Sequence, residues 1–245
     1  MSEQVQVMIT GAAGTMGRAV AESFAGDEYR LILVDVNEQA VRKVADSFGS
    51  RAVAVSVDIG NYDAVRKVMT NLQAQIGTID ILINNAGILS NNKVMETSPE
   101  EWHRVMRVNV DGAFYLSQAV IPGMRKKKWG RIINVSSFAA KSGGITAGTA
   151  YSVSKGALIS LTFTLAAETA ADGITVNAIA PAYVRTPMVT EQLNDEQRAA
   201  MVAKIPVHRY CEPEEFAHVV QFLASRKAGF ITGEVIDQNG GLQFD

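Results

Sequence analysis

A tyrosine and a lysine stand four residues apart in the segment Tyr151-Ser-Val-Ser-Lys155, which opens a stretch with helical character. Residues i and i+4 of a helix share a face, so the two side chains would be neighbours. A lysine ammonium beside a phenol stabilises the phenolate and lowers the tyrosine pKa from about 10. A tyrosine tuned in this way can exchange a proton with an alcohol or carbonyl oxygen. The pair predicts such chemistry, although the same spacing also arises by chance on helix surfaces.

Two serines, Ser136 and Ser137, directly follow the β-rich run Arg131–Val135. At the carboxyl end of a strand, a serine hydroxyl could bond the same substrate oxygen as the tyrosine. Successive strand residues point to opposite faces, so we expect only one of the two serines to face the site.

A glycine-rich turn, Thr10–Gly17, joins the β-rich run Val5–Ile9 to a helical stretch. Glycines allow a tight turn and a close approach of the backbone to a pyrophosphate. The helix N-terminus adds free N–H groups and a positive dipole end. Glycines also punctuate ordinary strand–helix turns, but this turn follows the first strand of an alternating chain. That context favours a dinucleotide site.

Asp35 ends the next β-rich run, Leu31–Val34, and lies 18 residues after Gly17, near the separation of about 20 typical of dinucleotide sites. Its carboxylate could accept hydrogen bonds from both adenosine ribose hydroxyls, or it could cap the strand end or pair with Arg18. It would repel a 2′-phosphate about 4 Å away by about 4 kcal/mol per charge pair at an effective dielectric near 20. No arginine or lysine follows in Val36-Asn-Glu. The sequence therefore favours NAD(H) over NADP(H).

The elements that would position these residues alternate along the chain. Apolar, β-rich runs alternate with amphipathic stretches, as expected of parallel strands covered by helices on both faces. The pattern predicts a single α/β domain over residues 1–245, a doubly wound Rossmann-type fold with a seven-stranded parallel sheet and a ligand crevice at the carboxyl ends of the strands. The expected strands are Val5–Ile9, Leu31–Val34, Ala52–Val57, Ile79–Ile83, Arg131–Val135, Thr175–Ile179 and Glu234–Asp237. The expected helices are Gly17–Phe24, Glu38–Phe48, Tyr62–Gln75, Pro99–Met124, Ser152–Ala171 and Pro213–Ser225.

The composition fits one globular chain. Its 245 residues carry 23 Lys+Arg and 25 Asp+Glu, a net charge of −2 that excludes a globally basic nucleic-acid binder. The single cysteine, Cys211, cannot form an intramolecular disulfide, which favours a reducing compartment. We expect a cytoplasmic protein without a membrane span, because no run approaches about 20 apolar residues. His103, His208 and His218 have no metal-ligand spacing, so no metal site is expected.

Taken in order, these motifs make the chain resemble the short-chain dehydrogenase/reductase family across nearly its whole length. Each piece alone is modest, whereas their order and spacing together are highly specific. The resemblance implies hydride transfer directly between a nicotinamide and a secondary alcohol or its ketone, without a metal. The matching pieces are Thr10–Gly17, Asp58-Ile59, Asn84-Asn-Ala-Gly87, Asn109 in Arg107-Val-Asn-Val, Ser136-Ser137, Tyr151 with Lys155, Pro181-Ala-Tyr-Val-Arg-Thr186, and Ile231-Thr-Gly-Glu-Val-Ile-Asp237.

The resemblance also implies a catalytic tetrad. Tyr151 would be the general acid/base, and Lys155 would lower its pKa and hold the nicotinamide ribose. Ser137, which matches the family position better than Ser136, would orient and polarise the substrate oxygen. Asn109 would hold a water that links Lys155 to solvent. The residues implied to bind the cofactor are Gly11, Thr15, Met16, Gly17, Asp35, Asp58, Ile59, Asn85, Ala86, Gly87, Tyr151, Lys155, Pro181, Val184 and Thr186.

Three positions depart from the family pattern. Thr15 stands where a middle glycine is usual, so the turn is either reshaped or gains a hydroxyl directed at the pyrophosphate. The spacing from Ser137 to Tyr151 is one residue longer than usual, which the loop Ala139–Ala150 can absorb. Ala182 replaces a glycine and limits the backbone on the nicotinamide side.

The sequence leaves two classes of enzyme, with different substrates, as alternatives. The overall pattern is nearest to 3-oxoacyl reductases that act on carrier-protein or CoA thioesters. Asp35 and Asp172 point instead to an NAD-dependent polyol, sugar-acid or hydroxyacid dehydrogenase. The basic run Arg125–Lys128 either complements a helix C-terminus or docks an acidic carrier protein or a CoA phosphate. Asp172 argues against the carrier, because carrier-dependent relatives are expected to have a basic residue there.

The segment between Tyr183 and Pro206 is expected to be a lid over the substrate, partly apolar because it contains Met188, Val189, Leu193 and Met201. Arg185 in this segment either meets a substrate carboxylate or faces solvent. The resemblance further suggests a homotetramer. An alternative of another class, a non-catalytic dinucleotide-binding sensor, is disfavoured because the tetrad residues are all present.

Overall fold

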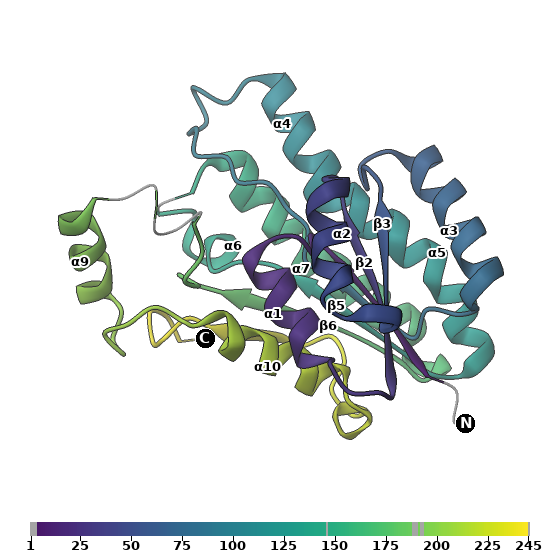
Figure 1. Ribbon diagram of the computed structural model, residues 1–245. Helices are drawn as coiled ribbons and strands as arrows, with labels where there is room; N and C mark the ends of the chain where they lie inside the picture. Colours follow the sequence, from purple (N-terminus) through teal and green to yellow (C-terminus); the bar gives the residue numbers. More distant parts are fainter. Residues whose placement is uncertain (1–3, 146, 188–190, 192–193, 245) are drawn as a thin grey trace.

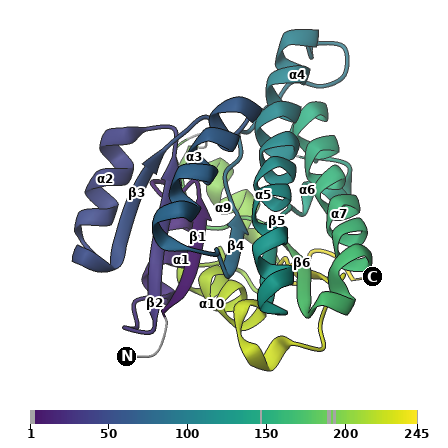
Figure 2. The ribbon, with the colours of Figure 1, turned by 90° about the vertical axis from the view of Figure 1, so that its right-hand side faces the viewer.

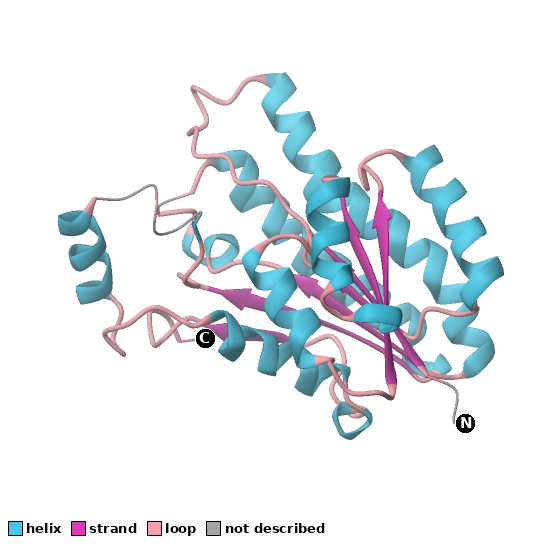
Figure 3. Cartoon of the chain, viewed as in Figure 1, coloured by secondary structure: helices cyan, strands magenta, loops and turns pink. Residues whose placement is uncertain are grey.

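The computed structural model describes residues 4–145, 147–187, 191 and 194–244. At its centre lies a seven-stranded sheet in the order β3-β2-β1-β4-β5-β6-β7, with every neighbouring pair parallel. The strand order reverses between β1 and β4, where open α/β sheets bind ligands. The arrowheads of β5 and β6 point to the side where α6 (Ala139–Ser142) and α9 (Asp195–Lys204) lie (Figures 1 and 3). The strands are β1 Val5–Thr10, β2 Tyr29–Asp35, β3 Ala52–Ser56, β4 Ile81–Asn84, β5 Gly130–Val135, β6 Ile174–Pro181 and β7 Val235–Gln238.

Helices cover both faces of this sheet (Figure 2). Strand residues alternate between the faces, so Val7 and Ile9 of β1 pack into one apolar cluster and Met8 packs into the other. The first cluster includes residues of α1 (Thr15–Ser23), α2 (Glu38–Asp46) and α10 (Pro213–Ala224). The second includes residues of α3 (Tyr62–Ile76), α5 (Gly112–Lys127) and α7 (Thr149–Thr169). Short 3₁₀ turns occur at Gly49–Arg51, Ala170–Asp172 and Arg226–Ala228.

The seven-stranded parallel sheet predicted from the sequence is confirmed, with strand ends shifted by no more than two residues. The expected helix Pro99–Met124 differs most. It consists of α4 (Pro99–Met106), a π-helical turn (Arg107–Asp111) and α5, which continues to Lys127. A π-turn inserts one residue into the helical repeat, and a register shift of one residue is too small to separate from an uninterrupted helix by sequence pattern. No helix within the described ranges is both long and apolar enough to cross a membrane.

Two of the described helices, α6 and α9, were not predicted from the sequence, and both lie near the carboxyl ends of the strands (Figure 1). α6 is a single turn in a Gly/Ala-rich loop. α9 falls within the expected lid, and it begins with a capping box in which Asn194 and Gln197 each bond the other's backbone N–H. That capping pair was the available sequence signal for α9.

A buried polar chain fastens α7 to the sheet. The amide of Asn84 in β4 donates to the Asn134 side-chain oxygen at 2.8 Å, and the Asn134 amide donates to the Thr162 hydroxyl of α7 at 2.9 Å. Asn134 and Thr162 are fully buried. Because α7 carries the tyrosine–lysine pair in its first turns, this chain of bonds sets the position of that pair against the strand ends.

Replacing Asn134 with alanine removes the acceptor of Asn84 and the donor to Thr162 in the interior. A buried polar group left without its partner costs about 1–3 kcal/mol. We therefore expect Asn134→Ala to lower the free energy of unfolding by about 2–4 kcal/mol, measured by urea denaturation. The matched control is Asn71→Ala, an exposed site on α3, which should change stability by less than about 0.5 kcal/mol. Equal stability of the two variants would show that the polar chain does not hold α7.

Candidate active site

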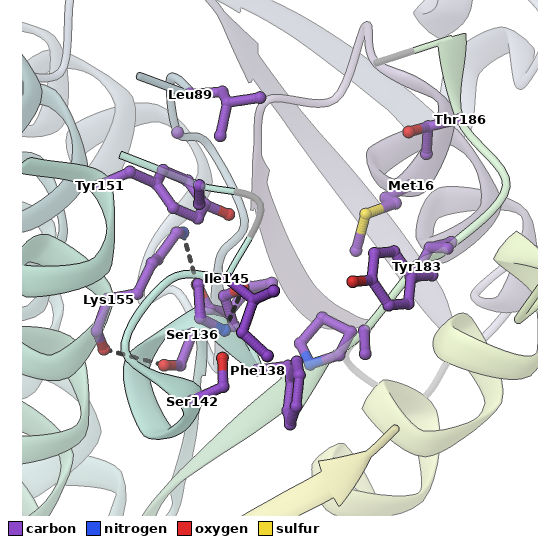
Figure 4. A pocket seen from close by; sticks show the side chains of 18 of the residues that line it. Met16, Leu89, Ser136, Phe138, Ser142, Ile145, Tyr151, Lys155, Tyr183 and Thr186 are labelled. Atoms are coloured by element: carbon purple, nitrogen blue, oxygen red, sulfur yellow. Dashed lines mark hydrogen bonds between the residues drawn. The ribbon is translucent and has the colours of Figure 1, made fainter. Parts of the chain in front are cut away.

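A pocket of about 290 Å³ opens at the carboxyl ends of the central strands. Tyr151 and Lys155 form one of its walls, and Met16, Tyr183 and Thr186 lie across from them (Figure 4). The pocket brings together predicted site residues from distant parts of the sequence. These are Met16, Asn85, Gly87, Ser137, Tyr151, Lys155, Pro181, Val184 and Thr186.

Lys155 is buried in the second turn of α7, and its ammonium donates to the Val135 carbonyl at the end of β5 at 2.7 Å. Its own backbone carbonyl accepts a hydrogen bond from the Ser136 hydroxyl at 2.8 Å (Figure 4). Burial lowers the pKa of Lys155 to about 8, because desolvation disfavours the charged form. The ammonium is therefore still largely protonated at neutral pH.

Tyr151 lies in the first turn of α7, with its phenol oxygen directed into the pocket (Figure 4). Burial raises the pKa of this phenol, and a hydrogen bond with the Ser137 side chain offsets only part of that rise. The expectation that Lys155 lowers the tyrosine pKa is therefore wrong for this structure. The physical reason is that the ammonium bonds the Val135 carbonyl and lies 5.7 Å from the centre of the phenol ring. The phenol keeps its proton at neutral pH.

The two adjacent serines behave as strand alternation predicts. Ser136 is buried and bonds the backbone of Lys155, whereas Ser137 is partly exposed and lines the pocket together with Tyr151. The Ser137 hydroxyl also accepts a hydrogen bond from the Ala139 N–H at 3.1 Å, which fixes the side chain at the start of α6. Ser137 is thus the serine beside the phenol.

Asn109 occupies the middle of the π-turn between α4 and α5 and is buried. Its amide oxygen accepts from the Ile88 N–H at 2.8 Å. Its amide nitrogen donates to the Ile88 carbonyl at 3.1 Å and to the Ser154 hydroxyl at 2.9 Å. The side chain therefore ties the segment after β4 to α7. A water held by Asn109 stays a prediction.

The glycine turn offers a cradle that fits a phosphate. α2, α3 and α4 each begin with a side-chain cap from Asn37, Asn61 or Ser98. In α1 the N-cap residue is Gly14, which provides no side-chain cap, and the first turn has no acidic residue. A Cβ on Gly17 would clash with the Gly11 carbonyl. The first N–H groups of α1 are thus free to meet an anion, and the helix dipole favours one.

Gly11 itself has φ +65°, a conformation that favours glycine, and a Cβ there would lie 2.9 Å from the Ala86 Cα. Thr15 is exposed at the start of α1, so its hydroxyl is accessible to a ligand. These observations make the turn a fitting site for the pyrophosphate of a dinucleotide.

Asp35 is the last residue of β2 and lies beside this turn. One carboxylate oxygen accepts from the Ala13 N–H at 3.1 Å and the other from the Asn37 N–H at 3.0 Å. Among the residues that the structure describes, Asp35 forms no ion pair, so the alternative of a bond with Arg18 is not realised. Instead Arg18 is exposed and lines a separate hollow together with Glu22.

Thr10, the first residue of the glycine-rich turn, joins the ends of β1 and β4, a role that the sequence did not predict. Its hydroxyl accepts from the N–H groups of Asn85 and Ala86 at 3.0 and 2.9 Å, and the Asn85 side chain donates to the Thr10 carbonyl at 2.9 Å. A Cβ on Gly87 would lie 3.2 Å from the Lys155 ammonium. The predicted segment Asn85–Gly87 therefore runs from the glycine turn to Lys155.

Asp58 and Ile59, predicted to lie at the adenine, follow β3. Asp58 accepts from the Gly60 N–H at 2.9 Å and lies 3.8 Å from the Arg107 guanidinium. Ile59 is buried against Gly112 at the start of α5. Neither residue lines the pocket that contains Tyr151, so their contact with a cofactor stays a prediction.

The segment after β6 supplies Pro181, Val184 and Thr186 to the pocket wall. Between them Tyr183 adopts φ +48°, which is uncommon for a bulky residue and is typical of functional sites. Of the expected lid residues, Met201 lines the pocket, whereas Met188, Val189 and Leu193 lie outside the described residues.

Arg185 does not enter the pocket. Its guanidinium bonds the Glu212 carboxylate at 2.9 Å, and both side chains are exposed. The alternative of a substrate carboxylate on Arg185 is therefore disfavoured, because its charge is already paired.

The basic run at the end of α5 is largely neutralised. Arg125 and Lys128 both bond Asp172 at 2.8 Å, and Lys127 bonds the buried Asp80 at 2.9 Å. The run precedes β5, so it lies at the amino edge of the sheet, whereas the pocket lies at the carboxyl edge.

Two further features concern metal sites and the single thiol. Within the described ranges no group of three or more His, Cys, Asp or Glu residues could hold a metal ion. Burial raises the pKa of the Cys211 thiol to about 11, as expected of an inert cysteine.

Several pocket residues were missed because they carry no motif. These residues are Leu89, Phe138, Ser142, Ile145 and Tyr183. The hydroxyl of Ser142 is buried and has no hydrogen-bond partner among the described residues. Their position follows from α6 and from the backbone path after β4 and β6, which no local sequence pattern shows.

Comparisons with known proteins agree with this geometry. A family model described as enoyl-(acyl carrier protein) reductase matches residues 11–243. The 3-oxoacyl-[acyl-carrier-protein] reductases of Vibrio cholerae serotype O1 and Escherichia coli strain K12 are 39% and 37% identical to the chain over 236 residues, which is 96% of both proteins in each case.

Two solved structures from Brucella melitensis share the fold. A short-chain dehydrogenase/reductase described as glucose/ribitol dehydrogenase has a TM-score of 0.90 and 33% identity, and the match covers 99% of both chains. A 3-oxoacyl-[acyl-carrier protein] reductase has a TM-score of 0.92 and 35% identity, and covers 100% of this chain and 93% of that one. The resemblance seen in the sequence is confirmed, and the chain belongs to the short-chain dehydrogenase/reductase family of NAD(P)-dependent oxidoreductases that act on CH–OH groups.

Proposed function

We propose that this enzyme reduces the ketone of a 3-oxoacyl thioester, with NADH as the cofactor and Tyr151 as the general acid. The observation that carries the proposal is the chemistry of the pocket wall. Among the described lining residues Lys155 is the only charged one, and Leu89, Phe138, Ile145 and Met201 make the wall mainly apolar. Such a wall suits an uncharged acyl group.

The same wall disfavours the alternative substrates. A hydroxyacid or sugar acid would bring a carboxylate into a pocket whose one described cation, Lys155, is bonded to Val135. A polyol would need a hydrogen-bond partner for each of its hydroxyls, because an unpaired buried polar group costs about 1–3 kcal/mol. Polyol, sugar-acid and hydroxyacid dehydrogenation therefore rank behind ketone reduction.

The protonation states support the reductive direction. Tyr151 keeps its proton because burial raises its pKa, and a protonated phenol is the form that donates to a developing alkoxide. Ser137 orients the same substrate oxygen, and the Lys155 ammonium would hold the nicotinamide ribose. When bound, the reduced nicotinamide supplies the hydride.

The pairing of the basic run supports a CoA thioester over a carrier-bound one. Arg125 and Lys128 both bond Asp172, and Lys127 bonds Asp80, so little unpaired positive charge is left there for an acidic carrier protein. The homotetramer suggested by the resemblance is proposed as well, and light scattering at micromolar concentration tests it.

A substrate panel tests the proposed function. Acetoacetyl-CoA with NADH should be turned over faster than 3-hydroxybutyrate, polyols or sugar acids with NAD⁺. Tyr151→Phe should reduce that activity by about 10²–10⁴-fold, because the proton donor is lost, while NADH still binds. The matched control is Tyr62→Phe, an exposed tyrosine on α3, which should retain full activity.

Other outcomes of the panel contradict the proposal in distinct ways. Turnover of polyols or hydroxyacids alone would make the enzyme a catabolic dehydrogenase. Tight dinucleotide binding without turnover of any substrate would favour the non-catalytic sensor.

Cofactor preference tests the assignment of Asp35. Its charge disfavours a 2′-phosphate, so the wild-type enzyme should use NADH better than NADPH. Asp35→Ser should raise the ratio of kcat/KM for NADPH to that for NADH by at least about tenfold after solvent screening. Asp35→Glu keeps the charge and should keep the preference. A wild-type preference for NADPH would mean that Arg18 or the turn at Thr15 holds the phosphate.

The pH dependence of reduction tests the buried lysine. Burial lowers the Lys155 pKa from its ordinary 10.5 to about 8, so the ammonium is lost as the pH rises through about 8. Tyr151 keeps its proton over this range, because its pKa is raised. We therefore expect kcat/KM for reduction to be level below about pH 7 and to fall about tenfold per pH unit above 8. A level profile to pH 10 would show that the ammonium is not required.

A further inference from the structure

The loop between α6 and α7 leads directly into the catalytic tyrosine. It contributes Ile145 and Ala147 to the pocket wall, and Tyr151 follows within the first turn of α7. This is also the stretch in which the chain from Ser137 to Tyr151 is one residue longer than the family pattern predicts. The path of this loop therefore determines where the phenol lies relative to the Ser137 hydroxyl.

One lysine from a distant part of the chain holds this loop. The Lys93 ammonium donates to the Gly144 carbonyl and to the Ala147 carbonyl, both at 2.7 Å. A single cation thus joins two carbonyls that lie three residues apart along the loop. Hydrogen bonds from a charged donor are roughly twice as strong as neutral ones.

Two backbone bonds continue the contact up to α7. The Gly148 N–H donates to the Ser90 carbonyl at 2.7 Å, and the Thr149 N–H donates to the Asn92 carbonyl at 3.0 Å. A Cβ on Gly148 would lie 2.5 Å from the Asn92 carbonyl oxygen, so only glycine allows this close approach. These bonds therefore hold the loop against the segment from Ser90 to Lys93.

The segment that carries Lys93 is itself anchored to α4. The Ser90 hydroxyl donates to one oxygen of the Glu101 carboxylate, and the Asn92 amide donates to the other oxygen at 2.7 Å. These bonds hold the pKa of Glu101 below its ordinary value, so the carboxylate stays charged at neutral pH. Glu101 lies in the first turn of α4, whose cap residue Ser98 accepts from its N–H at 3.2 Å.

We propose that Lys93 is a positioning residue of this enzyme. It fixes the longer loop before α7 so that the Tyr151 phenol meets Ser137 and the pocket wall at Ile145 and Ala147 keeps its shape. Lys93 does not line the pocket, so it acts through the loop and not on the substrate. The kinetic part of the proposal rests on the proposed function, whereas the structural part does not.

The test compares Lys93→Met, which keeps the length of the side chain and removes its donors, with Lys93→Arg, which keeps a cationic donor. Misplacement by about 1 Å costs up to about 10²-fold in rate. Lys93→Met should therefore lower kcat for acetoacetyl-CoA reduction by about tenfold to a hundredfold, with a smaller change in KM. Lys93→Arg should restore most of the rate. The matched control is Lys67→Met, an exposed lysine on α3, which should match the wild type.

Hydrogen exchange supplies a second readout that needs no substrate. In Lys93→Met the amides of Gly148 and Thr149 should exchange faster than in the wild type, while those of β5 stay protected. If the wild-type enzyme does not reduce acetoacetyl-CoA, the proposed function fails. The exchange comparison then still tests whether Lys93 fixes the loop before α7. Unchanged exchange at these two amides, or an unchanged kcat with only a lower Tm, would overturn the proposal.

Discussion

The ammonium group of Lys155 lies in the interior of the protein, where a charge without a partner is strongly unfavourable. The hydrogen bond from this ammonium to the Val135 carbonyl gives the buried charge a partner. The same bond joins α7 to the end of β5. The Ser136 hydroxyl, on the backbone carbonyl of the same lysine, adds a second tie between the two elements. The distance from the strand end to the first turn of α7, and hence the position of Tyr151, depends on these contacts.

The other elements of the site support this junction from further away. Asn134 and Thr162 fasten α7 to the sheet below it, and Asn109 connects α7 to the segment after β4. The bonds of Lys93 complete the support at the N-terminus of α7. Each support is a polar side chain bonded to backbone or to another side chain, so the geometry of the pocket is set by directional contacts as well as by apolar packing.

Much of this arrangement could be predicted from the sequence because parallel strands impose a simple geometry. Once the apolar runs were recognised as strands, the residues at their carboxyl ends had to share one edge of the sheet. Asp35, Ser137 and the glycine turn were found in this way, and strand alternation separated Ser136 from Ser137. The number of strands and their parallel arrangement followed from the alternation of strands and helices, whereas the order of the strands came from the structure.

What could not be predicted depends on tertiary contacts. The π-turn at Asn109 shifts the helical register by a single residue, which the spacing of apolar residues did not reveal. Burial raises the pKa of Tyr151, and the i, i+4 spacing alone shows neither this burial nor that the Lys155 ammonium bonds a backbone carbonyl. Lys93 has no motif, and its partners lie more than fifty residues later in the chain.

The single cysteine has a practical consequence. With its pKa raised to about 11, the Cys211 thiol is almost entirely protonated at neutral pH, and the thiolate is the form that reacts with alkylating reagents. The natural chain is therefore close to a cysteine-free background for site-directed labelling. A fluorophore or spin label attached through one introduced cysteine on α9 or on the loop before α7 would report on that segment alone, without prior removal of Cys211.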